Sequence, residues 1–148
     1  MPEENYDRDF PNLRKLGFRR TSEPAYQNCI AFVVGDRKRK WWPGEYHPEW
    51  SLDYWPEGVP QEETAGAFIQ ALATVGFEPC LDGSREEGFE KIAIYALGAE
   101  VRHAARQEED GTWRSKLGED EDIEHTLDGL AGTLYGKVGA FLRRQRIG

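Results

Sequence analysis

The apolar residues of the chain recur at two spacings, one typical of helices and one typical of strands. Residues 64–76 carry apolar side chains at helical spacing after Thr64, a favoured N-cap type, and end at a glycine. Residues 28–35 begin with Asn28, another favoured N-cap residue, and continue as an almost wholly apolar run to a glycine. The pattern predicts a helix at each place, the second of them buried. A further short helix is predicted over residues 8–16.

The second half of the chain alternates between short β-rich runs and turn residues. The runs cover residues 91–96, 101–107 and 112–116, and turns of hairpin type separate them. They predict an antiparallel meander. Residues 122–130 are expected to form a short helix, and residues 137–143 are expected to form a last strand.

Helices followed by strands predict an α+β fold, in which N-terminal helices pack on the antiparallel meander. Because no repeat or Ser- or Gly-rich linker divides the chain, residues 1–148 are expected to form a single domain. Residues 1–24 are interpreted as an extension of it. The apolar positions selected by each element's period are expected to share one core, which contains Phe68, Ile69, Leu72, Ile92, Ile94, Val138 and Phe141.

Composition and charge exclude several classes of partner. The formal charge is -8, with 27 acidic against 19 basic residues, which argues against a nucleic-acid partner because the phosphate backbone requires a basic surface. No apolar run approaches the ~20 residues that span a bilayer, so no membrane partner is expected. The N-terminus lacks a secretory signal, and Cys29 and Cys80 are therefore interpreted as thiols of a cytoplasmic protein.

Tryptophan and tyrosine side chains concentrate between residues 37 and 60, in a stretch rich in proline and glycine. This pattern is typical of an irregular loop that large rings hold in place. Aromatic side chains also serve as anchors at interfaces. Trp41, Trp42 and Trp55 are therefore candidate binding residues.

Cys29 is the first candidate for chemistry. If the Asn28 cap is right, Cys29 lies in the first turn of a helix, where free backbone N–H groups favour a thiolate. The same N–H groups, with Gln27 or Asn28 as side-chain donors, can form an oxyanion hole. The alternative is that Cys29 is a small apolar residue on a buried helix.

His103 is the second candidate, since a histidine on the meander can act as general base if it reaches the thiol. Counting across the predicted hairpin places Gln107 opposite Thr112 and His103 opposite Lys116, while a one-residue bulge would bring Ser115 there instead. His125, on another element, is also a candidate for the residue that orients His103.

A neighbour must fix the tautomer of a working His103 by accepting a hydrogen bond. A hydroxyl or a neutral imidazole can accept, whereas a lysine ammonium offers no acceptor. Ser115 or His125 is therefore expected to contact His103. Lys116 is expected instead to hold a carboxylate, from the protein or from a ligand. The alternative is that residues 115–118 are only a strand end and a turn.

No cofactor and no metal is predicted. The cysteines and histidines of the chain supply zinc-type ligands, but none has a spacing that puts two ligands on one element. The acidic run of residues 119–122 lacks the register of a calcium loop. No phosphate-binding glycine loop occurs in the sequence.

A cysteine on a buried N-terminal helix, followed by a histidine on an antiparallel sheet, resembles the papain-like group, especially the NlpC-type and CHAP-type amidases. In that group a third polar residue on the following strand orients the imidazole. More of the chain is similar to an uncharacterised family of small bacterial domains, over about residues 26–144. The segments that carry this similarity are NCIAF, KRKWWPG, YWPEGVP, GFEKIAIYA, HAARQ and SKLG.

Two functions are compatible with these residues. The first is a Cys-His hydrolase or acyltransferase, in which Cys29 attacks an amide or ester carbonyl and His103 transfers the proton. The second is an inactive papain-like binding module, such as an immunity, antidefence or adaptor protein. Its acidic surface would meet a basic protein partner, and the Trp-rich loop would supply anchors.

Overall fold

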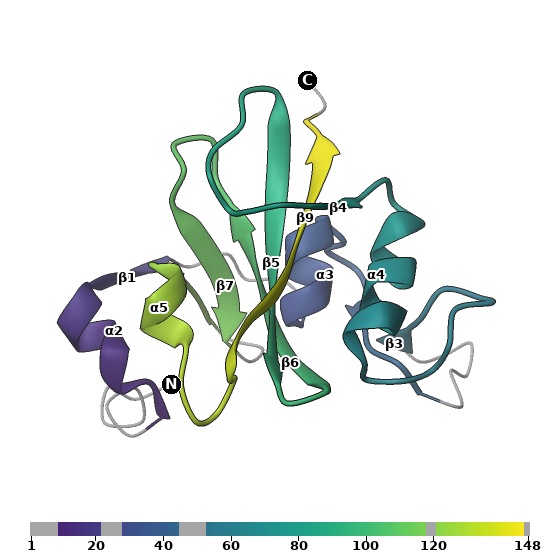
Figure 1. Cartoon of the computed structure of the whole chain (residues 1–148), viewed down its shortest axis with the longest axis horizontal. Helices are drawn as coiled ribbons and strands as arrows, with labels where there is room; N and C mark the ends of the chain where they lie inside the picture. The colour runs from purple at the N-terminus through teal and green to yellow at the C-terminus, as the bar shows by residue number, and fades with distance from the viewer. Residues whose placement is uncertain (1–8, 22–27, 45–52, 118–120, 147–148) are drawn as a thin grey trace.

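The computed structural model describes residues 9–21, 28–44, 53–117 and 121–146. Figure 1 shows a sheet with helices on either side of it. Along the chain the helices and strands of the described residues follow in this order: α2 (Pro11–Leu16), β1 (Phe18–Thr21), α3 (Cys29–Val34), β2 (Lys40–Trp41), β3 (Asp53–Tyr54), α4 (Ala65–Ala73), β4 (Glu78–Cys80), β5 (Phe89–Leu97), β6 (Glu100–Gln107), β7 (Trp113–Leu117), β8 (Glu121–His125), α5 (Leu127–Leu130) and β9 (Lys137–Gln145).

The main sheet has seven strands within the described ranges, in the order β1-β8-β7-β6-β5-β9-β4. Each pairing of neighbours in it is antiparallel. β2 and β3 form a separate parallel pair. The α+β class and the antiparallel sheet predicted from the sequence are therefore confirmed, and β5, β6 and β7 are neighbours as the meander required.

Each face of the sheet carries its own apolar core, because successive side chains of a strand point to opposite faces. α3 and α4 contact one face, and α2 and α5 contribute to the other (Figure 1). The α3–α4 core consists of Ile30, Ala31, Phe32, Val33, Trp41, Trp55, Ala67, Phe68, Ala71, Leu72, Phe77, Ile92, Ile94, Val101, Ala104 and Leu142. The α2–α5 core consists of Phe10, Leu13, Ala93, Tyr95, Ala105, Trp113, Leu117, Ile123 and Leu130.

The predicted single core is therefore wrong in part. Phe68, Leu72, Ile92 and Ile94 share the α3–α4 core, and Ile69 packs against it. Val138 and Phe141 instead pack against the α2–α5 core, on the other face. The helical period shows which side of a helix is buried, but it does not show which face of the sheet the neighbouring strand residues line.

The two buried helices begin where the capping residues predicted. The Asn28 side chain accepts a hydrogen bond from the Ala31 N–H at 3.0 Å, and the Thr64 hydroxyl oxygen accepts one from the Ala67 N–H at 3.3 Å. Gly35 ends α3 with a φ of 83°, a conformation that glycine adopts without a Cβ penalty. Local chemistry is sufficient to set these boundaries.

Other elements differ from the expectation. Residues 121–125 form strand β8, so the helix predicted over residues 122–130 is reduced to α5. The strands β1 and β4 were not predicted, and the helices alternate with the strands instead of preceding them. β1 and β4 are the two edges of the sheet, where short strands with little apolar pattern gain their order from a neighbour.

Within the described ranges, no helix is long and apolar enough to cross a lipid bilayer.

Candidate functional site

Cys29 is the first residue of α3, as the sequence predicted, but its surroundings do not favour a thiolate. The side chain is partly buried and packs against the α3–α4 core. Burial raises the pKa of the Cys29 thiol to about 11, although a backbone hydrogen bond from Ala104 acts in the opposite direction. Because the thiolate is the nucleophilic form, Cys29 is a weak nucleophile near neutral pH.

His103 lies in β6 and faces the α2–α5 core. Its ring stacks on Tyr135 with 4.2 Å between the ring centroids, and Tyr95 lies beside it at 5.7 Å. Only 1% of the residue is exposed. Burial, together with the nearby His125, lowers the pKa of His103 well below its usual value. His103 Nε2 has no hydrogen-bond partner within the described residues.

The structure does not bring Cys29 and His103 together. His103 is opposite Tyr95 in the β5–β6 ladder, and the next residue, Ala104, is opposite Ile94. Tyr95 belongs to the α2–α5 core, whereas Ile94 and Ala104 belong to the α3–α4 core, against which Cys29 packs. The sheet therefore separates the thiol from the imidazole, and the expected Cys29–His103 cleft is wrong.

Ser115 and His125 do meet. Ser115 Oγ lies 2.6 Å from His125 Nε2, and His125 Nδ1 lies 2.6 Å from the carbonyl oxygen of Thr126. A carbonyl can only accept, so the neutral ring donates from Nδ1 and accepts the Ser115 hydroxyl at Nε2. Burial lowers the pKa of His125 to about 4, which favours this neutral form. Ser115 is fully buried, so no substrate reaches its hydroxyl.

The position of Lys116 follows from a register that differs from the expectation. Gln107 is opposite Trp113 in the β6–β7 ladder, one residue beyond the predicted partner, Thr112. Ser115 therefore points to the same face as His103, while Lys116 points to the other face. Lys116 is buried and lies opposite Asp122, whose carboxylate accepts a hydrogen bond from Arg114 at 2.5 Å.

The described tryptophans support the fold. Trp41 and Trp55 are buried, and their indole N–H groups donate to the Asp36 carboxylate and to the Pro60 carbonyl. Trp42 is partly buried and donates to Glu63. Both Trp42 and Trp55 contact the ring of Phe68 edge-on. The rings thus hold the 53–64 segment on α4 instead of forming an exposed anchor.

The two predicted oxyanion donors have different outcomes. Asn28 uses its side chain to cap α3 and to pair with the backbone of Trp41, donating to the carbonyl at 2.6 Å and accepting from the N–H at 3.1 Å. It therefore has a structural role. Gln27 lies outside the described residues.

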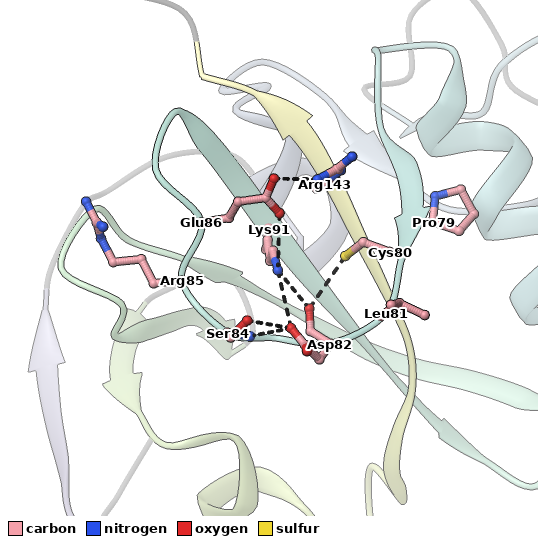
Figure 2. A pocket seen from close by; sticks show the side chains of 9 residues that line it. All are labelled: Pro79, Cys80, Leu81, Asp82, Ser84, Arg85, Glu86, Lys91 and Arg143. Carbon is pink, nitrogen blue, oxygen red and sulfur yellow. Dashed lines mark hydrogen bonds and ion pairs between the residues drawn. The ribbon is translucent and has the colours of Figure 1, made fainter.

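A pocket that the sequence did not indicate lies between β4, β5 and β9 (Figure 2). Its volume is about 440 Å³, within the range of small-molecule sites. We call it the Lys91 pocket. It is lined by Pro79, Cys80, Leu81, Asp82, Ser84, Arg85, Glu86, Lys91 and Arg143.

Lys91 is the buried member of this pocket. Its side chain is only 4% exposed, and its ammonium donates to the Asp82 carbonyl oxygen at 3.0 Å. The carboxylates of Asp82 and Glu86 are farther away, at 3.5 and 3.7 Å. Lys91 therefore makes one short hydrogen bond and two loose ion pairs, and the carboxylates involved are themselves partly exposed.

The Cys80 thiol binds the same oxygen. Cys80 Sγ donates to the Asp82 carbonyl oxygen at 3.5 Å, and its dashed line meets that of Lys91 at this oxygen in Figure 2. Burial raises the pKa of the Cys80 thiol, while the charges of Lys91 and Arg143 act to lower it. Cys80 is partly exposed.

The remaining cations of the pocket differ in their partners. Arg143 makes ion pairs with both Glu78 and Glu86. Arg85 donates from Nε to the Glu109 carbonyl oxygen at 2.6 Å, and it makes no ion pair with any residue that the structure describes. Arg85 is thus an exposed cation of the pocket that no carboxylate of the described residues neutralises.

The sequence contains one signal for this pocket. In the run 89–97, Lys91 has the same parity as Ala93 and Tyr95, which are buried in the α2–α5 core. A lysine at an inward-facing strand position requires a polar partner, because an unpaired buried ammonium is costly. The partner comes from the 81–88 segment, whose path the local sequence does not specify. Within the described ranges, no group of three or more His, Cys, Asp or Glu side chains could hold a metal ion.

Comparison with known proteins adds a family but no activity. Residues 19–143 match the model of a family described as a domain of unknown function, DUF7689. No curated protein and no solved structure matches the chain. The similarity to an uncharacterised family is confirmed, while nothing links the chain to papain-like hydrolases.

Proposed function

The chain belongs to the DUF7689 family, and we propose that it works as a binding module whose Lys91 pocket holds the acidic group of a small ligand. The observation that supports this proposal is the local charge of the pocket. Three of its lining residues are basic and two are acidic, in a chain with a formal charge of -8. An anion that approaches this acidic protein therefore meets a locally basic pocket.

Lys91 and Arg85 supply the donors. An acidic group that enters the pocket can accept from the Lys91 ammonium, whose ion pairs with Asp82 and Glu86 are loose and water-exposed. The guanidinium of Arg85 can donate to an acidic ligand without breaking an ion pair with a described residue. Carboxylate and phosphate both suit this chemistry, since each offers several oxygens to cationic donors.

The hydrolase hypothesis has less support. Cys29 and His103 line different cores, and the Ser115–His125 pair is closed to substrate. The docking surface proposed from the sequence also changes, because Trp41 and Trp55 are core residues. The proposal keeps a binding role. It changes the partner from a basic protein to a small acidic ligand and the site from the Trp-rich loop to the Lys91 pocket.

Titration of the full chain with inorganic phosphate and with succinate, followed by NMR of backbone amides, tests the proposal. We expect shifts concentrated at residues 80–86. Arg85→Ala should weaken binding roughly three- to tenfold, because it removes one charge-assisted hydrogen bond to the ligand. Lys91→Met, which keeps the buried volume, should weaken it more. Arg102→Ala, an exposed arginine of β6 outside the pocket, is the matched control and should leave binding unchanged.

Two outcomes would reject the proposal. One is the absence of shifts at residues 80–86 at the highest soluble probe concentration. The other is equal weakening by Arg85→Ala and Arg102→Ala, which would indicate screening of net charge instead of a site. The hydrolase hypothesis would gain if an electrophilic thiol probe labelled Cys29 in a His103-dependent manner.

A further inference from the structure

Cys80 and Lys91 place a thiol and an amine on one oxygen atom. Both donate to the carbonyl oxygen of Asp82, Cys80 Sγ at 3.5 Å and Lys91 Nζ at 3.0 Å. The side chains come from different strands, β4 and β5, and both point toward the Asp82 carbonyl oxygen in Figure 2. Because a single acceptor holds both groups, the Cys80 sulfur and the Lys91 nitrogen can be no farther apart than the two hydrogen bonds laid end to end. The charge of Lys91 also acts on the Cys80 thiol.

The two groups differ in access. Cys80 is partly exposed in a pocket that is open to solvent, so a small oxidant can reach its sulfur. The Lys91 side chain is 4% exposed, so its amine is shielded from large reagents and faces the pocket interior. Reaction of the oxidised Cys80 sulfur with the Lys91 amine is therefore favoured over its reaction with a second protein molecule.

We propose that Cys80 and Lys91 form a peroxide-dependent sulfur–nitrogen cross-link. Hydrogen peroxide oxidises the Cys80 thiol to a sulfenic acid and is itself reduced to water. The Lys91 amine, after losing its proton to solvent, then attacks the sulfur. The S–N bond forms, the S–O bond breaks, and the hydroxyl leaves as a second water. The protein loses two hydrogen atoms in total, and a thiol reductant returns both side chains.

The surroundings of the pair determine how fast this occurs. Burial raises the pKa of the Cys80 thiol against the opposing charges of Lys91 and Arg143, so the thiolate is scarce at neutral pH. The oxidation is therefore expected to be faster as the pH rises. The cross-link also removes the charge of Lys91, which leaves Asp82 and Glu86 without their shared cation.

Intact-mass measurement on the full chain after treatment with hydrogen peroxide tests the cross-link. We expect a product that lacks two hydrogen atoms, with Cys80 and Lys91 in one linked peptide, and recovery of the starting mass with a thiol reductant. Cys29→Ser must give the same product, because a Cys29–Cys80 disulfide would have the same mass. In Lys91→Arg, dimedone should trap the sulfenic acid of Cys80.

Lys91→Met provides the same test if the arginine variant does not fold. The proposal is overturned if the wild type gains oxygen atoms only, or if the product disappears in Cys29→Ser. It is also overturned if the product persists in both Lys91 variants. The cross-link does not depend on what the pocket binds, so phosphate titration and mass measurement can fail separately.

Discussion

The two faces of the main sheet are built with different chemistry. The face under α3 and α4 is closed by apolar side chains and by tryptophans whose polar atoms bond at the rim. The face under α2 and α5 carries most of the buried polar side chains of the described residues, namely Lys91, His103, Gln107, Ser115 and His125. One face is an ordinary core, whereas the other is a polar network within a core.

The polar side chains of the α2–α5 face hold chain connections in place. Lys91 and Gln107 bind two successive carbonyl oxygens, those of Asp82 and Gly83. The Tyr95 hydroxyl donates to the Leu127 carbonyl oxygen at 2.6 Å at the start of α5. A buried polar group gains stability only when it is satisfied, so these bonds fix where the segments cross the sheet. The comparison predicts that the two faces respond differently to mutation and pH.

The largest expected effect is on the α3–α4 face. Leu72→Ala should lower the free energy of unfolding by about 2–5 kcal/mol, because Leu72 is fully buried and its truncation removes apolar contacts and leaves a cavity. Denaturant unfolding at two pH values measures it, and the loss should be the same at both. Leu97→Ala, at a position that is 42% exposed, is the control and should cost less than about 0.5 kcal/mol. A loss for Leu72→Ala as small as the control's would show that α4 is peripheral.

The second-largest expected effect is a fall in the free energy of unfolding in acid, caused by the histidines of the α2–α5 face. His103 and His125 have lowered pKa values in the folded state, so below about pH 6.5 the unfolded state binds protons that the folded state does not. Stability is then lost as the pH falls toward about 4, the folded pKa of His125. Between pH 7 and pH 5 we expect a loss of roughly 2–4 kcal/mol for the two groups.

Denaturant unfolding across this pH range checks the effect, and His103→Phe should reduce its slope. Phenylalanine keeps a ring on Tyr135 and removes one titrating group. A stability that stays constant between pH 7 and pH 5 would contradict the assignment of buried, neutral histidines. An unchanged slope in His103→Phe would assign the acid response to other groups.

A smaller effect is expected at Gly83. Its carbonyl oxygen accepts a hydrogen bond from Gln107, and the residue packs against the α2–α5 core. A Cβ at Gly83 would lie 2.7 Å from Phe141 Cε1 and 3.0 Å from Trp113 Cζ2, so the rings would have to move. Gly83→Ala should therefore cost about 1–3 kcal/mol in thermal or denaturant unfolding. Gly66→Ala is the matched control, since it lies inside α4 with open space around it and should stabilise by about 0.5–1 kcal/mol. Equal effects at both glycines would show that the 81–88 segment does not pack as described.

The smallest effect is expected for Arg85→Ala. The side chain is exposed and makes a hydrogen bond to the Glu109 carbonyl oxygen but no ion pair with a described residue. Its removal should change the unfolding free energy by less than about 0.5 kcal/mol while it weakens phosphate binding. A large loss of stability would assign Arg85 a structural role and weaken the binding proposal.

The candidate site could be predicted from the sequence only in its local parts. The Asn28 cap and the place of Cys29 in the first turn of α3 follow from side-chain chemistry within a few residues. Whether His103 faces Cys29 depends on strand parity and on the face that α3 covers, and a change of one residue reverses the answer. The β6–β7 register differed from the count by such a step, and it moved Lys116 to the opposite face from His103.

The sequence by itself determined the helices with strong caps, the β5–β6–β7 meander and the α+β class, because these depend on short-range chemistry and on periodicity. Only the tertiary structure decided that Cys29 and His103 line separate cores and that Cys80 and Lys91 share the Asp82 carbonyl oxygen. The physical reason is that both relations join distant segments through the sheet. Its edge strands and loop paths gain their order from neighbours and not from local propensity.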